Sequence, residues 1–233
     1  MKRSDLKFAV IIPALNEAES IPEVIRRIPG PFRELIVVAD NGSSDGTGEI
    51  AKTLGAHVVL ASERGYGSAC LTGIAYAKRI EPDIFIFLDA DYSDHPEDMA
   101  NLVGTLLEKN LDLVIGSRTL GGAEPGALLP QARFGNWLAT RLMYLRFGHL
   151  YSDLGPFRAI RTEALQRLNM QDRNFGWTVE MQIKALREGL RVGEVSVRYR
   201  KRIGVSKITG TIRGTVFAGI KILWTIGRYG LFR

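Results

Sequence analysis

The chain has 233 residues, of which 45% are hydrophobic and 24% are charged. These proportions are ordinary for a globular protein, and the length is sufficient for one catalytic domain with a sizeable core. The single cysteine, Cys70, excludes an internal disulfide framework and is compatible with a reducing compartment.

The sequence contains no signal for export or membrane insertion. The N-terminus leads straight into the first apolar run, so no signal peptide is expected. A membrane span needs about 18 or more consecutive apolar residues, and no such uncharged stretch occurs. We therefore predict a cytoplasmic protein.

Charge is distributed unevenly along the chain. Residues 1–116 contain 11 Lys and Arg against 18 Asp and Glu, a net charge of −7, whereas residues 117–233 contain 20 against 7, a net charge of +13. The second half is therefore expected to meet anions, either an anionic membrane surface or phosphate groups; a solvated basic face is the alternative. Because no zinc finger, helix-turn-helix or RNA-binding aromatic motif is present, no nucleic-acid partner is predicted.

Strands and helices alternate through the first half of the chain. Short apolar runs predict strands at residues 8–12, 35–39, 57–60, 84–88 and 111–115. Helical patterns lie between them, ending near residues 28, 54, 80 and 109. This alternation predicts an α/β fold with a doubly wound parallel sheet.

The second half is less regular. A loop is predicted at residues 121–126, helices at 132–147, 177–189 and 211–229, and a strand at 191–199. No linker separates these elements from the sheet, so we predict a single domain over residues 1–233.

Two carboxylates follow the apolar run at 84–88. Asp89 and Asp91 leave the predicted strand at its carboxyl end, where ligands collect in open α/β sheets. Two carboxylates one residue apart can bind one hard cation together with phosphate oxygens. The alternative is that one of them caps the helix beginning near Pro96 and the other is solvated.

Polar side chains also follow the first two predicted strands. Asp40 directly follows the second strand and could accept hydrogen bonds from a base or a ribose. Asp45 is interpreted as a cap of the next helix. After the first strand, Asn16 and Glu17 are candidate ligand contacts, although Glu17 also suits the first turn of a helix.

Three ordered motifs resemble family 2 glycosyltransferases with the GT-A fold. They are Ile11-Ile12-Pro13-Ala14-Leu15-Asn16-Glu17, Asp40-Asn41-Gly42-Ser43-Ser44-Asp45-Gly46-Thr47 and Asp89-Ala90-Asp91. Residues 116–118, 155–158 and 202–207 further resemble the dolichyl- or polyprenyl-phosphate mannose or glucose synthase branch. The resemblance, which covers residues 8–210, implies a Rossmann-like, mostly parallel central sheet flanked by helices.

The resemblance implies a donor site in the first half of the chain, residues 1–116. It places Pro13, Asn16, Glu17 and Asp40 at the base and ribose of a UDP- or GDP-linked sugar. It places Asp89 and Asp91 on Mg²⁺ or Mn²⁺ against the donor diphosphate. Two positions depart from the family pattern: Asn41 replaces a second acid, and Ser93 replaces a Gln that often joins the metal shell.

The resemblance also implies an acceptor half, residues 117–210. It places Arg118 and Arg133 near a lipid phosphate, and Arg202, Ser206 and Lys207 in a loop that closes over the phosphates, with Ser206 on the acceptor side and Lys207 on the donor side. Arginine can bind a phosphate through two hydrogen bonds, which supports these roles. We assign the catalytic contribution to Asp91, Arg118 and Arg202.

The implied reaction is metal-dependent hexose transfer with inversion. A phosphate acceptor is already anionic and needs no strong base, whereas an alcohol acceptor needs a carboxylate to take its proton. Asp153 and Glu180 are the candidates for that base, and a buried helix acid paired with an arginine is the alternative for Glu180. A soluble acceptor, a sugar-nucleotide pyrophosphorylase and a non-catalytic nucleotide-binding protein are the other functions considered.

Two basic, amphipathic segments bear on membrane contact. Residues 134–150 and the predicted C-terminal helix, 211–233, combine Trp, Phe and Leu with Arg and Lys. Such a helix can lie in a membrane interface, here on the cytoplasmic face. A stripe of this kind is also typical of a core or of a contact in a homo-oligomer, so both alternatives stay open.

Overall fold

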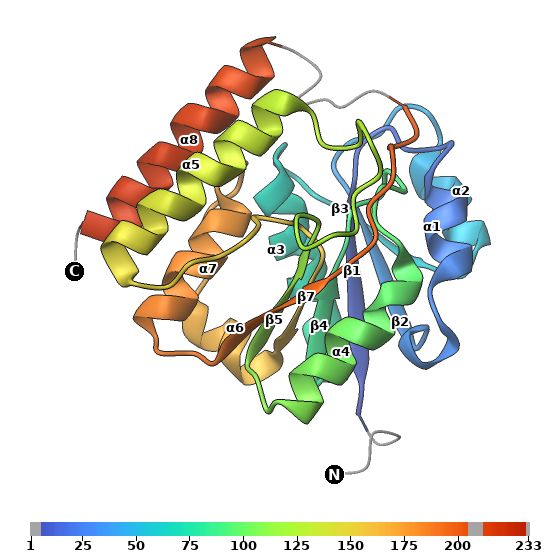
Figure 1. The fold of residues 1–233 in the computed structure, drawn as a ribbon. Helices are drawn as coiled ribbons and strands as arrows, with labels where there is room; N and C mark the ends of the chain where they lie inside the picture. The colour runs from blue at the N-terminus through green and yellow to red at the C-terminus, as the bar shows by residue number, and fades with distance from the viewer. Residues whose placement is uncertain (1–5, 205–211, 232–233) are drawn as a thin grey trace.

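One central sheet organises the computed structural model, which describes residues 6–204 and 212–231 (Figure 1). Within that part of the chain the sheet has seven strands, β1 (Phe8–Ala14), β2 (Leu35–Asp40), β3 (His57–Leu60), β4 (Ile84–Phe87), β5 (Leu113–Ser117), β6 (Arg158–Arg161) and β7 (Val192–Ser196). Their order is β3-β2-β1-β4-β6-β5-β7. Only β6 runs antiparallel to its neighbours, so the predicted mostly parallel sheet is confirmed.

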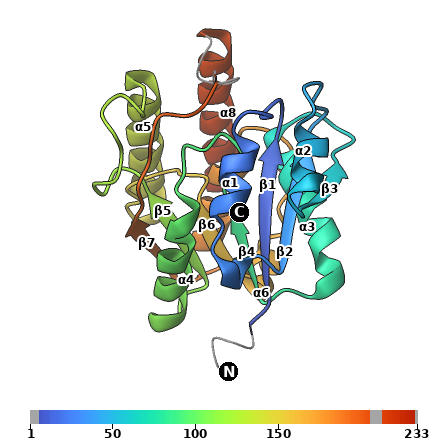
Figure 2. The ribbon, with the colours of Figure 1, turned by 90° about the vertical axis from the view of Figure 1, so that its right-hand side faces the viewer.

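Helices cover both faces of the sheet (Figures 1 and 2). They are α1 (Ile21–Arg27), α2 (Thr47–Thr53), α3 (Tyr66–Ala77), α4 (Met99–Glu108), α5 (Pro130–Phe147), α6 (Thr162–Leu168), α7 (Trp177–Arg187) and α8 (Ile212–Leu231). Short 3₁₀ turns occur at Gly30–Phe32, Lys78–Ile80 and Pro96–Asp98. Buried side chains of α1, α2 and α4 pack on one face, and those of α3, α5, α6 and α7 on the other.

The central strand β1 shows why the apolar runs become sheet rather than helix. All seven of its residues are buried, as expected for a strand with helices on both faces. Successive side chains alternate between the two faces, so Ala9 and Ile11 join one core while Phe8, Val10 and Ile12 join the other. A continuous apolar run is therefore required at this position.

Two elements were not predicted, namely β6 and α6. The strand has only four residues and carries an arginine at each end, so no apolar run marks it. It is held by partners far away in the sequence, since Ile160 pairs with Phe85 of β4 and Leu113 of β5. The predicted strand at 191–199 is also shorter, ending at Ser196.

Helices α5 and α8 form one side of the molecule. They lie side by side at the left of Figure 1, and α8 also packs against α7. Among the described residues, no helix is both long and apolar enough to cross a bilayer.

Candidate functional site

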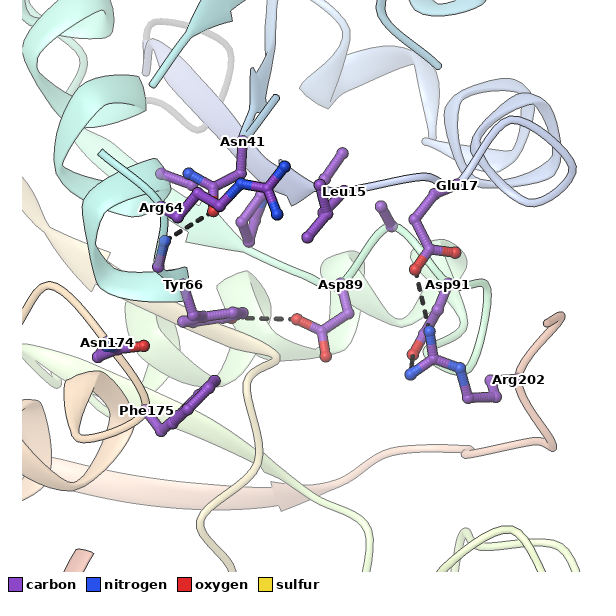
Figure 3. A pocket seen from close by; sticks show the side chains of 15 residues that line it. Leu15, Glu17, Asn41, Arg64, Tyr66, Asp89, Asp91, Asn174, Phe175 and Arg202 are labelled. Carbon is purple, nitrogen blue, oxygen red and sulfur yellow. Dashed lines mark hydrogen bonds and ion pairs between the residues drawn. The ribbon is translucent and has the colours of Figure 1, made fainter. Parts of the chain in front are cut away.

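A cavity of about 420 Å³ lies beyond the carboxyl ends of β1 and β4 (Figure 3). It is lined by Pro13, Ala14, Leu15, Glu17, Asn41, Arg64, Gly65, Tyr66, Ala69, Asp89, Ala90, Asp91, Asn174, Phe175 and Arg202. The two strands are parallel neighbours, so the loops that follow them meet at one edge of the sheet. Residues from both halves of the chain therefore build this cavity, hereafter called the donor pocket.

The two carboxylates after β4 both face the donor pocket. Asp89 Oδ1 accepts a hydrogen bond from the Tyr66 hydroxyl at 3.0 Å. Asp91 Oδ1 accepts two hydrogen bonds from Ser93, one from the backbone N–H at 2.9 Å and one from the hydroxyl at 2.5 Å. Burial, and then the negative charge of Asp91, raise the pKa of Asp89 to about 7. The pocket thus concentrates negative charge at the position expected for a cation.

Arg202 links this carboxylate pair to the loop after β1. Its Nη1 lies 3.0 Å from Asp91 Oδ2, and its Nη2 lies 2.9 Å from Glu17 Oε1 (Figure 3). These contacts span 185 residues of sequence between Glu17 and Arg202. Three residues predicted separately for one site are therefore adjacent in the fold.

Asp94 is a third acid beside the pair, and sequence reasoning missed it. It is almost fully buried, and its Oδ1 has no hydrogen-bond partner among the described residues. Burial, followed by the charges of Asp89 and Asp91, raises its pKa well above the ordinary value. Within the described ranges, however, no three His, Cys, Asp or Glu side chains form a ready-made metal site. A cation here would need ligands from elsewhere.

Pro13 and Glu17 line the donor pocket, whereas Asn16 and Asp40 are not among its lining residues. Asn16 Oδ1 accepts a hydrogen bond from the N–H of Ser44 at 2.8 Å. Asp40 Oδ1 accepts from the N–H of Ser43, also at 2.8 Å. The structure shows these two side chains holding the loops after β1 and β2 in place, and their contact with a base or ribose stays a prediction.

Two further residues of the second motif also have structural roles. Asp45 Oδ1 accepts a hydrogen bond from the N–H of Thr47, the first residue of α2, at 3.0 Å. The N-cap residue is Gly46, without a side-chain cap, so Asp45 holds the turn before α2 and is not its N-cap as predicted. Asn41 donates to the carbonyl of Glu63 at 2.9 Å and accepts from the N–H of Gly65 at 2.7 Å. An aspartate at position 41 could not make the first bond, which explains why an amide suits this site.

The expected acceptor residue Arg118 forms an internal ion pair. Its Nε and Nη2 each lie 2.8 Å from a different oxygen of Asp153, and its backbone N–H also donates to Asp153 Oδ2. Burial alone would raise the pKa of Asp153, but the charge and hydrogen bonds of Arg118 outweigh it and lower that pKa. Asp153 is therefore engaged by Arg118 rather than free, its role as a base stays a prediction, and Arg118 is not among the residues that line the donor pocket.

Glu180 also has a structural environment. It is fully buried in α7 and accepts hydrogen bonds from the N–H groups of Gln171 at 3.0 Å and Asp172 at 2.7 Å. Lys184 pairs with it at 2.7 Å. Glu180 is therefore a buried, paired acid, with a lysine where an arginine was expected, and its role as a base stays a prediction that this pairing does not favour.

Of the other predicted phosphate-binding residues, Arg133 is exposed on α5 and does not line the donor pocket. Ser206 and Lys207 lie outside the described residues.

Replacing Asp153 by asparagine tests its structural role. The change should lower the free energy of unfolding by about 3–5 kcal/mol, because it leaves Arg118 buried with a weakened partner. The matched change Asp112→Asn breaks a more exposed pair with Arg191 and should cost about 1 kcal/mol or less. Denaturant unfolding measures both, and a wild-type midpoint for Asp153→Asn would contradict this role.

Sequence reasoning missed most of the wall opposite Asp89. Tyr66 begins α3 and holds Asp89, while Asn174 and Phe175 come from the segment before α7 (Figure 3). The glycines on either side of Tyr66 were the available signal. A Cβ atom on Gly67 would lie 1.9 Å from the carbonyl oxygen of Asp172, so this close contact of two backbones requires glycine.

Comparison with known proteins agrees with the fold and the motifs. The model of glycosyl transferase family 2 matches residues 9–168. An uncharacterised glycosyltransferase of Mycobacterium tuberculosis is 37% identical over 211 residues, covering 90% of this chain and 93% of its own length. An undecaprenyl-phosphate mannosyltransferase of Micrococcus luteus is 29% identical over 236 residues, covering 92% and 93%.

Among solved structures, glucosyl-3-phosphoglycerate synthase from Mycobacterium tuberculosis in complex with Mn²⁺, UDP-glucose and phosphoglyceric acid has a TM-score of 0.79. The match covers 99% of this chain and 82% of that chain at 23% sequence identity, and it shows the fold. Family match, motif order and fold agree. The chain belongs to glycosyl transferase family 2 and has the GT-A fold.

Proposed function

We propose that the protein transfers a hexose from a nucleotide-diphospho-sugar to a polyprenyl-phosphate-like lipid, with inversion at the anomeric carbon. The observation that carries the donor side is the convergence of Asp89, Asp91 and Arg202 at the donor pocket. The relative named as an undecaprenyl-phosphate mannosyltransferase supports the acceptor class.

The donor pocket suits a nucleotide diphosphate with a divalent cation. Carboxylate oxygens of Asp89 and Asp91 are ligands of the kind that Mg²⁺ and Mn²⁺ prefer, and phosphate oxygens of the donor would complete the shell. Burial, and then the charge of Asp91, raise the pKa of Asp89, and a bound cation would favour its ionised form. When bound, the metal would act as a Lewis acid on the leaving diphosphate. The fold neighbour was crystallised with Mn²⁺ and UDP-glucose, which supports this donor class.

The residues of the chain bind and orient the reactants. Arg202 already faces the pocket, so its charge is available to the leaving diphosphate once its contact with Asp91 is exchanged. Lys207 is proposed to assist on the donor side, and Arg133 and Ser206 to hold the acceptor phosphate. Arg118 is proposed to act indirectly, by shaping the acceptor half through its ion pair with Asp153.

A phosphate acceptor is consistent with the environment of the two candidate bases, because neither Asp153 nor Glu180 is free to take a proton. Asp153 is committed to Arg118, and Glu180 to Lys184 and two backbone N–H groups. An acceptor phosphate brings its own negative oxygen, so no side chain has to remove a proton from it.

The experiment that tests this function is a panel of UDP- and GDP-sugars with Mg²⁺ or Mn²⁺, with and without polyprenyl phosphate, followed by product mass. A glycosylated lipid phosphate supports the proposal. Transfer to phosphoglycerate or another soluble acceptor, but not to the lipid, would replace it with the soluble-acceptor function.

The α5–α8 face suits the membrane that holds such an acceptor. Its exposed apolar side chains include Phe134, Trp137, Leu145, Phe217, Ile220 and Trp224. Arg141, Arg146 and Arg228 accompany them, and neither helix contains an Asp or Glu. A helix pair with apolar and cationic side chains is expected to lie in an anionic interface. We propose that the protein docks peripherally on the membrane through this face.

Docking predicts a specific response in vesicle sedimentation. Trp137→Ser and Trp224→Ser should each weaken binding to anionic vesicles by at least about tenfold, because burial of a large apolar side chain is worth about 1.5–3 kcal/mol. Binding should also weaken as salt rises. The control change Leu60→Ser alters a more exposed apolar residue on β3, outside the face, and should leave binding unchanged. Equal effects of all three changes would contradict the proposal.

A further inference from the structure

The segment between α6 and α7 contacts three separate parts of the molecule. Residues 171–176 contribute two side chains to the donor pocket, touch the start of α3 with their backbone, and contact α8 through Asp172. Two buried carboxylates hold the segment itself. Glu180 accepts hydrogen bonds from the N–H groups of Gln171 and Asp172, and Asp172 Oδ1 accepts from those of Asn174 at 2.7 Å and Gly176 at 3.1 Å.

On the pocket side, this segment sets the position of the wall. Asn174 and Phe175 line the cavity (Figure 3). The carbonyl of Arg173 accepts a hydrogen bond from the N–H of Ser68 at 2.9 Å, in the first turn of α3. Because the backbones also meet at Gly67, a shift of the segment would move the start of α3 and with it Tyr66, whose hydroxyl binds Asp89.

On the other side, α8 holds the segment. Lys221 Nζ lies 2.8 Å from Asp172 Oδ2. One turn later, Thr225 is fully buried, and a Cβ atom on Gly176 would lie 2.5 Å from its Oγ1. Thr225 lies on the inner side of α8, and Lys221 reaches Asp172 while its Nζ also lies 4.4 Å from the centroid of the Trp224 ring. Ile220 and Trp224 are exposed and belong to the α5–α8 face. One helix therefore bears both the proposed membrane contact and the support of the pocket wall.

We propose that Asp172 is a positioning residue of the donor pocket and that Lys221 holds it, so that donor binding depends on how α8 is seated. The inference rests on the proposed function in taking this cavity as the donor site, and its consequence for membrane contact rests on the proposed docking of the α5–α8 face. Oδ1 of Asp172 accepts the hydrogen bonds of the segment, and Oδ2 forms the ion pair with Lys221. The ion pair therefore fixes the orientation of the carboxylate that holds residues 174–176 in place. By linkage, donor binding should in turn favour the seated position of α8, and contact of α8 with a membrane should strengthen donor binding.

The test uses the full-length protein with three single substitutions of lysine residues, two of Lys221 and one of Lys52. Lys221→Met removes the ion pair, Lys221→Arg keeps a cation there, and Lys52→Met is the matched control because it breaks a 2.7 Å pair with Glu49 on α2, away from the pocket. Asp172→Asn, which keeps an acceptor oxygen but loses the charge, is the second route if Lys221→Met does not fold.

Two measurements are made on each variant. Amide hydrogen exchange at Ser68, Asn174 and Gly176 measures how often the segment 171–176 opens, and it needs no ligand. The exchange should be about tenfold faster in Lys221→Met and Asp172→Asn than in the wild type. The Kd for UDP-glucose and for GDP-mannose with Mn²⁺ should rise about tenfold for the sugar nucleotide that the wild type binds. Lys221→Arg should restore both values, and Lys52→Met should match the wild type.

The outcomes separate this inference from the proposed function. If the wild type binds neither sugar nucleotide, the donor assignment fails, while unchanged exchange at the three amides would still overturn the link to α8. If the wild type binds a donor and a folded Lys221→Met or Asp172→Asn binds it equally well, Asp172 does not position the pocket. An equal loss in Lys52→Met would likewise overturn the inference, since the effect would then be one of general stability.

Discussion

Replacing Asp91 by asparagine should lower the rate of hexose transfer by about 10²–10³ while leaving the fold intact. Asp91 lies at the edge of the donor pocket beside Asp89, and its Oδ2 faces Arg202. The substitution keeps the hydrogen bonds to Ser93 within reach but removes one of the two charges proposed to hold the cation against the diphosphate. Steady-state kinetics with saturating Mn²⁺ and donor measure the loss as a change in kcat.

A stability measurement makes this prediction independent of the unknown sugar. Mn²⁺ should raise the unfolding temperature of the wild type, and it should do so much less for Asp91→Asn, because a ligand that binds only the folded state stabilises it. Asp112→Asn is the matched control, since that carboxylate pairs with Arg191 far from the pocket in the fold. Full activity in EDTA, or an equal Mn²⁺ shift in all three proteins, would contradict the assignment.

Ionisation of the neighbouring carboxylate, Asp89, should destabilise the fold in metal-free buffer. The folded pKa of Asp89 is raised to about 7, so its ionisation opposes folding. Its contribution to stability is complete below about pH 4 and is lost as the pH rises through about 7. Asp89→Asn cannot ionise, so at pH 8 in EDTA it should unfold at a higher temperature than the wild type even though it transfers no hexose efficiently.

The parts of this site that were predictable from sequence are those encoded by local pattern. Buried strands between two helix layers must be apolar along their whole length, so β1 and β4 are visible as continuous runs. The residues that follow such strands must meet at one edge of the sheet, which is why Pro13, Glu17 and Asp91 were correctly placed near one another.

The parts that were missed depend on contacts between distant segments. The strand β6 has no apolar run, because it is held by pairing with β4 and β5 on either side rather than by its own hydrophobicity. Tyr66 and Phe175 reach the pocket only because backbones more than 100 residues apart touch at Gly67 and Asp172. The local pattern of apolar and polar residues predicts helices and strands, but it does not predict such a contact between distant segments.

The two buried acids show why a chemical role is hard to assign from sequence. Asp153 and Glu180 were the candidate bases of the basic half of the chain, with a buried acid paired with an arginine as the alternative for Glu180. In the fold each has several donors: Arg118 for Asp153, and Lys184 with two backbone N–H groups for Glu180. Whether a carboxylate is available for chemistry is decided by these tertiary partners, so burial and pairing had to be seen before a role could be assigned.

Arg202→Met should lower kcat by about 10² with a smaller effect on the KM for donor, because its charge is proposed to act on the diphosphate as it leaves. The guanidinium is placed for this, since one nitrogen contacts Asp91 and another contacts Glu17 at the pocket edge. Arg202→Lys keeps the charge but cannot contact both carboxylates through a planar fork, so an intermediate rate is expected.

The control for this prediction is Arg198→Met, four residues earlier in the chain. Arg198 forms a shorter ion pair, 2.6 Å from Asp98, but its side chain is 55% exposed and it does not line the pocket. Its replacement should leave kcat within about twofold, because an exposed pair contributes about 1 kcal/mol or less to stability and nothing to the site. If Arg202→Met transferred hexose at the wild-type rate, the bridge to Asp91 would be a purely structural contact. If both variants lost activity equally, the segment after β7 would act as a whole, and the catalytic role would not belong to Arg202 alone.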